Sequence, residues 1–308
     1  MRNRTIEPLH AARSWPVVTD LSVCAIIVTY HPSLDMLENV DLVLDQVQGL
    51  VVVDNGSNPN QLAPWQAASR DRCFKLIENG VNLGIAEALN QGISWAQDQG
   101  FSWVILFDQD SKITPGYLGS MFETWRSHPE RDRICSIFPN YTDPDTGKEV
   151  AFRRARDGGP IIAMTSGALM PTWIFDKIGR FRSDYFVDEV DAEYCFRSRA
   201  AGYLLADSRQ AVLHHQIGLP KKSTFLGFGF TPTHHNAVRR YYMSRNRVVL
   251  YKQYFFKFPA RVLKSISDAF LETTKCFLGE EDRVRKLRNF LLGTWDGLIG
   301  RMGKREDI

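Results

Sequence analysis

Three short apolar runs, each followed by polar residues, limit what this chain can fold into more than any other feature of its sequence. The runs are 23–28, 50–53 and 103–107, and their unbroken apolar character is typical of strands buried on both faces of a parallel sheet. Residues 33–47 and 85–99 carry apolar side chains at spacings of three or four, as amphipathic helices do. The alternation predicts an α/β domain with a mostly parallel sheet flanked by helices.

Polar residues end each of these runs, and in such sheets ligands bind at the carboxyl ends of the strands. Thr29 follows the first run. Asp54 stands in an Asp-Asn-Gly-Ser sequence that can turn sharply and leave its carboxylate free for a ribose hydroxyl or a base N–H, although an ordinary turn explains the same residues. Asp108 and Asp110 follow the third run, where two carboxylates can face one hard cation. We expect these ends to share one crevice.

A glycine at the start of the predicted helix 85–99 points to the same edge. Asn82 and Gly84 precede the helix, and a small residue there lets a ligand approach the positive end of the helix dipole. The segment has neither the P-loop nor the G-x-G-x-x-G spacing. ATP hydrolysis and hydride transfer are therefore poorly supported.

Four carboxylates within six positions precede an apparent helix at 194–200: Asp188, Glu189, Asp191 and Glu193. Such a cluster persists where a cation, a base function or an arginine partner uses it, or as the acidic first turn of a helix. His214 and His215 follow a predicted strand around 211–213 and could complete a metal site, although histidine pairs are more often structural. Gly167, in Thr-Ser-Gly-Ala-Leu, brings backbone amides near a sugar or forms a tight turn.

In their order and spacing, several segments together resemble family 2 glycosyltransferases over roughly residues 22–250. These segments are Val28-Thr29-Tyr30, Asp54-Asn55-Gly56-Ser57, Asn82-x-Gly84 with Ala88 and Asn90, Asp108-Gln109-Asp110-Ser111, Ser166-Gly167-Ala168, Asp191-x-Glu193 and His215-x-x-Gly218. The Asp-Gln-Asp-Ser variant, residues 188–195 and Tyr242-x-x-Arg245-Asn246 resemble the rhamnosyltransferase branch that builds bacterial surface polysaccharides. The resemblance implies the GT-A fold, a single Rossmann-like α/β domain, and inversion at the anomeric carbon.

The resemblance also implies roles for individual residues. A nucleoside diphosphate leaving group gains charge that Mg²⁺ or Mn²⁺ can neutralise, and an acceptor hydroxyl needs a carboxylate base. Asp110 would contact the metal, Asp108 would help to hold metal and sugar nucleotide, and His215 would contact the metal or the diphosphate. Asp191 would be the base, a role that Asp188 or Glu189 could share because Val190 stands where many relatives have another acid. The remaining matches fall into two groups. Thr29, Asp54, Asn82 and Gly84 match positions that bind the nucleotide sugar. Gly167 and Glu193 match positions on the acceptor side, where Glu193 would support the acceptor site or orient its loop.

The branch resemblance alone implies dTDP-L-rhamnose as donor, with another sugar nucleotide as the alternative. It implies a saccharide or lipid-linked saccharide hydroxyl as acceptor, in O-antigen-like polysaccharide synthesis.

The C-terminal region alternates aromatic and basic residues from Arg239 onward, and helical segments continue past Pro259 to about Gly303. A basic amphipathic helix can lie on a membrane surface, but the same aromatics could equally cover the catalytic domain or form a homo-oligomer interface. We expect an irregular lead-in at 1–20, a catalytic domain at 21–250 and a helical C-terminal extension at 251–308.

Composition narrows the remaining classes. The chain has 308 residues, a net charge of +3, which is too small for a dedicated nucleic-acid binder, and five scattered cysteines that suggest neither disulfides nor a zinc cluster. No apolar segment follows the N-terminal arginines, and none reaches the roughly 18 residues of a membrane span. We therefore expect a cytoplasmic protein, either soluble or at the inner face of the cell membrane.

Two other functions are alternatives to a glycosyltransferase. A basic, aromatic-bearing module that binds RNA or carbohydrate would use the C-terminal aromatics for stacking, but it leaves the ordered acidic motifs unexplained. A nucleotidyltransferase would also use metal-binding carboxylates, but it normally has a glycine- and lysine-rich loop after the first strand. Tyr30-His31-Pro32 is not such a loop.

Overall fold

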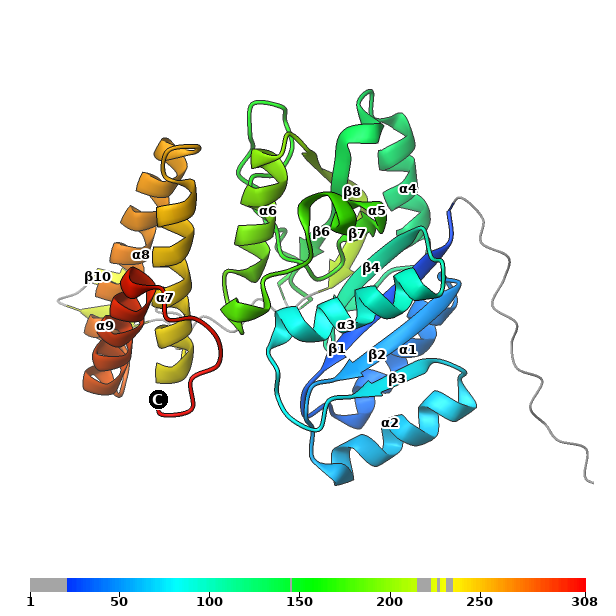
Figure 1. Ribbon diagram of the computed structural model, residues 1–308, viewed down its shortest axis with the longest axis horizontal. Helices are drawn as coiled ribbons and strands as arrows, with labels where there is room; N and C mark the ends of the chain where they lie inside the picture. Colours follow the sequence, from blue (N-terminus) through cyan, green and yellow to red (C-terminus); the bar gives the residue numbers. More distant parts are fainter. Residues whose placement is uncertain (1–20, 145, 215–222, 226–227, 231–234) are drawn as a thin grey trace, which may run out of the picture.

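The computed structural model describes residues 21–144, 146–214, 223–225, 228–230 and 235–308. The predicted lead-in at 1–20 and His215 lie outside these residues. The chain forms a sheet with helices on both faces, and three C-terminal helices lie beside one end of this α/β unit (Figure 1). The predicted α/β class with a helical C-terminal extension is confirmed.

An eight-stranded mixed sheet forms the centre, in the order β3-β2-β1-β4-β7-β6-β8-β5. The first four strands in this order are parallel, whereas β7 is antiparallel to both of its neighbours and β5 is antiparallel to β8. The strands are β1 (Val23–Thr29), β2 (Gly49–Asp54), β3 (Lys75–Glu78), β4 (Trp103–Asp108), β5 (Lys112–Ile113), β6 (Ile134–Thr142), β7 (Leu169–Pro171) and β8 (Leu204–His214). A separate hairpin pairs β9 (Ser223–Phe225) with β10 (Phe228–Phe230).

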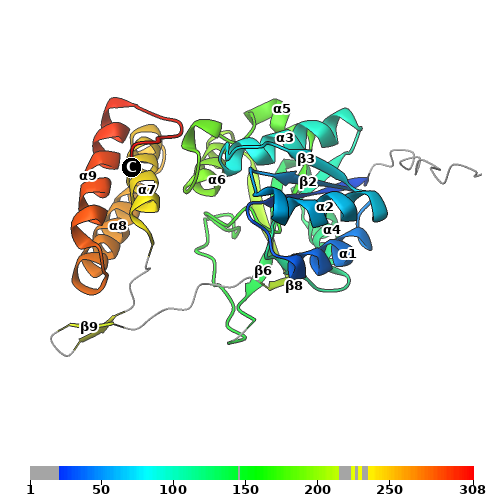
Figure 2. The same ribbon diagram turned by 90° about the horizontal axis from the view of Figure 1, so that it is seen from below.

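Helices cover both faces of the sheet (Figure 2), so that the strands β1, β2 and β4 are buried on both sides. Alternate residues of β1 enter different cores: Val23, Ala25 and Ile27 pack on one face, and the residues between them on the other. The first face is covered by α1 (Leu37–Leu44), α2 (Pro59–Asp71) and α4 (Tyr117–Ser127), and the second by α3 (Ile85–Asp98), α5 (Trp173–Ile178) and α6 (Val190–Ala200).

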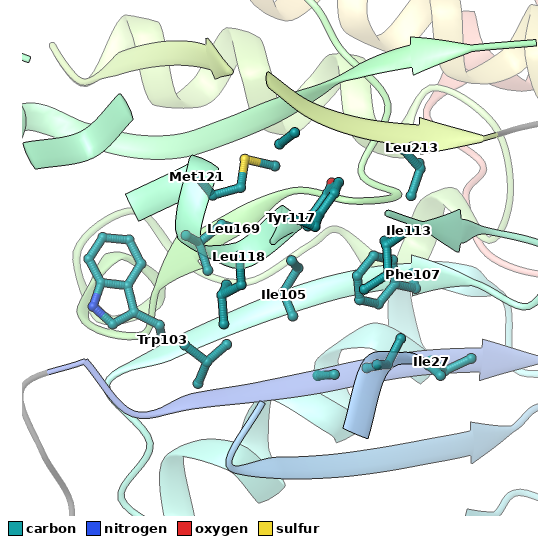
Figure 3. Packing of buried hydrophobic residues seen from close by; sticks show 14 of the residues in the cluster. Ile27, Trp103, Ile105, Phe107, Ile113, Tyr117, Leu118, Met121, Leu169 and Leu213 are labelled. Atoms are coloured by element: carbon teal, nitrogen blue, oxygen red, sulfur yellow. The ribbon is translucent and has the colours of Figure 1, made fainter. Parts of the chain in front are cut away.

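Large side chains of the central strand β4 fill the core on the α4 side (Figure 3). Trp103 and Phe107 of β4 belong to the same buried cluster as Tyr117 and Met121 of α4. Trp103 also makes an edge-to-face contact with Phe122, with 5.3 Å between the ring centroids. The strand that ends in Asp108 is therefore packed tightly against α4.

The C-terminal unit consists of α7 (Ala237–Tyr254), α8 (Pro259–Gly279) and α9 (Arg283–Ile299). It is joined to α6 by a small apolar core in which Phe196 packs with Tyr254 and Val262. Large apolar side chains on the outer surface of α8 and α9 are exposed, including Phe270 at 72% and Trp295 at 60%. Contact of this surface with a membrane or a second copy stays a prediction. In the described parts of the chain, no helix is both long and apolar enough to cross a membrane.

Strand register brings the polar strand ends together. Thr29 is paired with Asp54, and Val28 with Asp108, so β1, β2 and β4 end side by side at one edge of the sheet. The shared crevice that the sequence predicts at this edge is where the functional site is built.

Candidate active site

A pocket of about 560 Å³ lies at the carboxyl edge of the sheet. Its walls come from four places: the ends of β1, β2 and β4, the start of α3, the segment around Phe186, and the start of α7. The lining residues include Thr29, Asn55, Asn82, Gly84, Asp108, Gln109, Phe186, Arg239 and Tyr242. Four of the predicted nucleotide-sugar residues therefore lie together in one cavity.

Close approach of two backbones explains why Gly84 is a glycine. Its φ is +90°, and a Cβ there would lie 2.5 Å from the carbonyl oxygen of Phe186. The neighbouring Ile85 N–H donates to this carbonyl at 2.9 Å. Asn82 Oδ1 accepts from the Gly84 N–H at 2.9 Å. The start of α3 is thus fixed against the segment around Phe186, and the two form adjoining parts of the pocket wall.

Asp54 does not present the free carboxylate that the sequence suggested. The residue is only 1% exposed, and its carboxylate accepts from both the N–H and the hydroxyl of Ser57. The side chain closes the Asp-Asn-Gly-Ser turn, which is the ordinary explanation of this motif. Asp54 lies outside the residues that line the pocket, and its contact with a nucleotide stays a prediction.

Asp108 and Asp110 stand on a turn that is tied by hydrogen bonds to Ser166, 58 residues further along the chain. The Asp108 N–H donates to Ser166 Oγ at 3.1 Å, and the hydroxyls of Ser166 and Ser111 lie 2.6 Å apart. Asp108 is partly buried at the pocket, whereas Asp110 is exposed. The predicted third ligand, His215, lies outside the described residues.

The oxygen donors at this turn fit a divalent cation that is shared with a substrate. No group of three or more histidine, cysteine or acidic side chains suited to a metal occurs among the residues that the structure describes. A complete protein cage is not required, because Mg²⁺ is usually held by one or two carboxylates together with substrate phosphates. Asp108 and Asp110 can supply those carboxylates.

A second pocket, of about 380 Å³, has Asp191 in its wall. Most of its lining is apolar, with Tyr141, Phe152, Ile161, Met164 and Phe196 among the residues. Its polar side chains, apart from Asp191 and Ser265, are Arg153, Arg261, Lys264 and Asp268. Helix α8 contributes part of this wall, so the C-terminal unit helps to build the pocket.

Asp191 lies in the first turn of α6, because this helix begins at Val190 and not at Tyr194 as the sequence pattern indicated. One carboxylate oxygen accepts from the Ala192 N–H at 2.7 Å. Burial, and next the negative charge of Glu189, raise the pKa of Asp191 to about 7. A carboxylate with such a pKa can accept a proton efficiently near neutral pH.

The other three members of the acidic cluster are paired with arginines. Arg239 contacts Asp188 at 2.8 Å, and Arg247 contacts Glu189 at 2.7 Å. Burial raises the pKa of Glu189, while Arg247 opposes that rise. Asp191 is the one member that lines the second pocket. The four carboxylates therefore divide between arginine partners and a position suited to a base.

Glu193 and Gly167 have supporting positions. Glu193 is fully buried, and its carboxylate accepts from Arg197 at 2.7 Å and from the Tyr254 hydroxyl at 3.0 Å, which joins α6 to α7. Gly167 has a φ of +80°, and a Cβ there would lie 2.5 Å from the Tyr117 hydroxyl oxygen. Neither lines a described pocket, so the geometry supports an orienting role for Glu193 and a tight turn at Gly167.

Sequence reasoning assigned no role to the start of α7. Asn236 caps this helix by accepting from the Arg239 N–H at 2.8 Å, and both residues line the first pocket together with Tyr242. The run Arg239-Arg240-Tyr241-Tyr242 was the available signal. The sequence left open whether this run lies on a membrane, covers the catalytic domain or forms an oligomer interface, because nothing in it shows that α7 returns to the sheet edge.

The arrangement is that of an α/β domain with a pocket at the carboxyl ends of its parallel strands, which is where α/β enzymes bind their ligands. One pocket combines strand ends, a helix start and Asp108, and a second pocket has the partly buried carboxyl group of Asp191 in its wall. In agreement with this class, residues 24–182, more than half of the chain, match the model of the family described as "Glycosyl transferase family 2".

Relatives and solved structures agree with this match. The chain is 26% identical over 304 residues to the dTDP-rhamnosyl transferase RfbF of Shigella flexneri, covering 92% of this chain and 97% of that protein. Its fold is similar to that of the mannosyltransferase PcManGT from Pyrobaculum calidifontis, solved in complex with GDP-Man and Mn²⁺, with a TM-score of 0.56 and 17% identity over 91% of this chain and 87% of that one. It is also similar to S. aureus TarS 1-349 in complex with UDP-GlcNAc, with a TM-score of 0.52 and 11% identity over 91% and 92% of the two chains. The chain belongs to glycosyl transferase family 2 and is a glycosyltransferase.

Proposed function

We propose that the protein transfers a sugar, L-rhamnose from dTDP-L-rhamnose, to a hydroxyl group of a saccharide acceptor, with inversion and with the help of a divalent cation. The observation that carries this proposal is that the acidic segment contributes to both pockets. Phe186 and Val187 line the pocket at the strand ends, and Asp191 lines the other. The donor and the base that acts on the acceptor would therefore meet at this segment.

The donor would occupy the pocket of about 560 Å³. Thr29, Asn82 and Gly84 would contact the nucleotide, as the family resemblance implies, and Asp54 would support the floor of that site through its turn. Arg239 lies in the same pocket, where its guanidinium can reach a diphosphate group. Asp108 and Asp110 would hold Mg²⁺ or Mn²⁺ against the donor phosphates, and His215 is a further candidate ligand. When bound, the cation would stabilise the negative charge that develops on the leaving diphosphate.

The transfer itself would be a direct displacement. Asp191 takes the proton of the acceptor hydroxyl as the acceptor oxygen forms its bond to the anomeric carbon. The bond from that carbon to the diphosphate oxygen breaks, and the electron pair leaves with the nucleoside diphosphate. Attack from the face opposite the leaving group inverts the configuration. The pKa of about 7 suits Asp191 to this step.

The choice of sugar rests on similarity along nearly the whole chain to a protein named dTDP-rhamnosyl transferase. Another sugar nucleotide is the alternative. A lipid-linked acceptor, as expected in surface polysaccharide synthesis, is supported by α8, which has residues in the wall of the second pocket and exposed apolar side chains such as Leu263 and Phe270 beside them.

A binding and turnover comparison of two variants tests the assigned roles. Purified protein is titrated with dTDP-L-rhamnose and other sugar nucleotides, with and without Mg²⁺ or Mn²⁺, and release of nucleoside diphosphate is followed with acceptor present. We expect metal-dependent binding of dTDP-L-rhamnose that Asp110→Ala weakens at least tenfold. Asp191→Ala should bind the donor normally and lose turnover, because it removes only the base.

Binding of a different sugar nucleotide alone would retain the transferase and refute the rhamnosyl assignment. Equal donor affinity with and without metal would refute the cation role of Asp110. Folded protein, verified by circular dichroism, that binds no sugar nucleotide would favour a carbohydrate- or RNA-binding module instead.

A further inference from the structure

Asn246, in the middle of α7, makes an unusual set of contacts with the acidic segment. Its side chain is completely buried, and its Nδ2 donates to the carbonyl oxygens of Tyr185, Val187 and Asp188 at 3.0, 2.8 and 2.9 Å. Its Oδ1 accepts from Arg245 Nε at 3.0 Å, which fixes the end of the amide that faces the segment. One side chain of α7 therefore binds three backbone carbonyl groups within four residues of another segment.

Arg245 completes these contacts. It is also fully buried, and its Nη2 donates to the carbonyl oxygens of Asp184 and Tyr185 at 3.2 and 2.9 Å. Its guanidinium carbon lies 4.8 Å from the centre of the Tyr242 ring, which keeps it in place. Hydrogen bonds from a charged, buried donor are among the stronger ones in proteins. The two neighbouring residues together bind every carbonyl of the segment from Asp184 to Asp188 except that of Phe186, which accepts from α3.

The backbone that they hold is one that the segment would not adopt unaided. Phe186 has φ 64° and ψ −64°, and the Val187 N–H donates to the Tyr185 carbonyl at 2.8 Å, which is the rare, strained form of the γ-turn. Asp188 and Glu189 also have left-handed φ angles of 62° and 60°. Residues other than glycine remain in such conformations only where their surroundings determine them.

The strained backbone decides where Asp191 lies. Glu189 is the left-handed residue immediately before α6, so its conformation sets the direction in which the helix begins. Asp191 follows in the first turn and lines the second pocket. A relaxed segment would rotate or displace this first turn, and a misplacement of about 1 Å at a reacting group can slow a reaction about 100-fold.

We propose that Arg245 and Asn246 are positioning residues for glycosyl transfer, holding the backbone of residues 184–188 in the strained conformation that aims Asp191 into the second pocket. This inference rests on the proposed role of Asp191 as the base. It gives the Tyr-x-x-Arg-Asn motif of α7 a function in turnover, although neither residue lines a described pocket or would touch a substrate. It also explains why the segment before Asp191, in the α/β unit, is held by hydrogen bonds from α7 of the C-terminal unit.

A positioning role should alter the ionisation of Asp191, which a purely structural role elsewhere in α7 would not. Relaxation would hydrate the carboxyl group and move the acidic neighbours away, and both changes lower its pKa towards the ordinary value. Several titratable and charged groups surround Asp191. Asp188 and Glu189 come from its own segment, Tyr141 from β6 and Cys195 from α6. The wall of the second pocket adds Arg153 and, from α8, Arg261, Lys264 and Asp268.

The test compares Asn246→Leu with Asn289→Leu. Asn289 is also a buried asparagine, and its Nδ2 donates at 3.0 Å to the Ala237 carbonyl of α7 and to none of residues 184–189. Both substitutions replace an amide by an apolar group of similar size and change no charge. We expect Asn246→Leu to reduce kcat about 100-fold, to leave the donor Kd within about threefold, and to move the acidic limb of the pH–kcat profile to lower pH. Asn289→Leu should lower the melting temperature while kcat and the pH profile stay those of the wild type.

Arg245→Lys extends the test in case Asn246→Leu does not fold. It keeps a positive charge above Tyr242 and loses the forked donation, so we expect a smaller reduction of kcat, about tenfold, with the same direction of the pH shift. Wild-type kcat and pH profiles in the folded Arg245 and Asn246 variants would overturn the inference.

Asp191→Asn separates this failure from a failure of the proposed function. If Asp191→Asn retains turnover, the base assignment is wrong and the positioning role falls with it. If Asp191→Asn is inactive while the α7 variants behave as the wild type, only the positioning role is wrong.

Discussion

Lowering the pH from about 8 to about 6 should slow the transfer step about tenfold, because the base would have to be ionised before it can accept the hydroxyl proton. Burial and the nearby charge of Glu189 raise the pKa of Asp191 to about 7. With this pKa, the ionised fraction is about 0.9 at the higher pH and about 0.09 at the lower one. With the ordinary pKa of about 3.9, the carboxyl group would stay ionised throughout and the rate would hardly change. The raised pKa therefore has a measurable consequence.

Single-turnover rates at saturating donor, metal and acceptor would measure this dependence without the contribution of product release. Glu189→Gln keeps an oxygen that can accept from Arg247 and removes the negative charge. It should lower the pKa of Asp191 and bring the two rates closer together. Asp157→Asn is the matched control, because it removes a carboxylate that Arg199 contacts at 2.6 Å and that is not among the neighbours shifting the pKa of Asp191.

A wild-type rate that is equal at the two pH values, with donor affinity also unchanged, would refute the assignment of Asp191 as a base of raised pKa. An equal effect of Glu189→Gln and Asp157→Asn would show that the response is not local. Ionisation of Asp191 also changes the free energy of unfolding with pH. Because the folded-state pKa lies above the unfolded one, ionisation of Asp191 costs stability progressively as the pH rises from about 4 to about 7.

Two further predictions concern the framework that holds the site. Gly92→Ala should destabilise the protein by about 1–3 kcal/mol, since a Cβ there would lie 2.4 Å from Ile26 Cγ2. Gly119→Ala, on the exposed side of α4, should stabilise it by about 0.5–1 kcal/mol, because no atom lies within 4 Å of the added Cβ. Urea denaturation measures both changes, and equal effects would contradict the packing argument. Arg240→Met should cost about 1–3 kcal/mol, because the buried Glu280 loses a guanidinium at 3.1 Å and Glu272 loses one at 2.8 Å, while Lys286 still contacts Glu280 at 2.7 Å. Arg240→Lys keeps the positive charge and should cost less in the same assay, and an equal loss would show that the charge is not what matters.

Much of the fold and the donor side of the site could be predicted because both depend on local patterns. Strands buried on both faces are recognisable from unbroken apolar runs, and the observed β1, β2 and β4 agree with the predicted runs within one residue at either end. Parallel pairing then required that Thr29, Asp54 and Asp108 end at one edge. Helices α2 and α4 were not predicted, and α2 contains Pro64, a residue that argues against a helix when only the sequence is considered.

The acidic cluster shows where local patterns stop being sufficient. The sequence placed four carboxylates close together and favoured Asp191, but it could not tell which of them have arginine partners. Arg239 and Arg247 contact Asp188 and Glu189 across 51 and 58 residues of chain. Such contacts depend on the path of α7, which no periodicity reveals.

The sequence by itself determined an α/β sheet, the edge at which its polar strand ends meet, and the family whose motifs they follow. These properties follow from alternation of apolar and polar residues and from the short range of strand and helix patterns. Only the tertiary structure decided that Asp54 is closed by Ser57, that Glu193 is turned into the α6–α7 contact, and that Arg245 and Asn246 bind the strained segment before Asp191. The physical reason is that hydrogen bonds and burial depend on which distant segments meet, and a single sequence records the residues that can make such contacts without recording their partners.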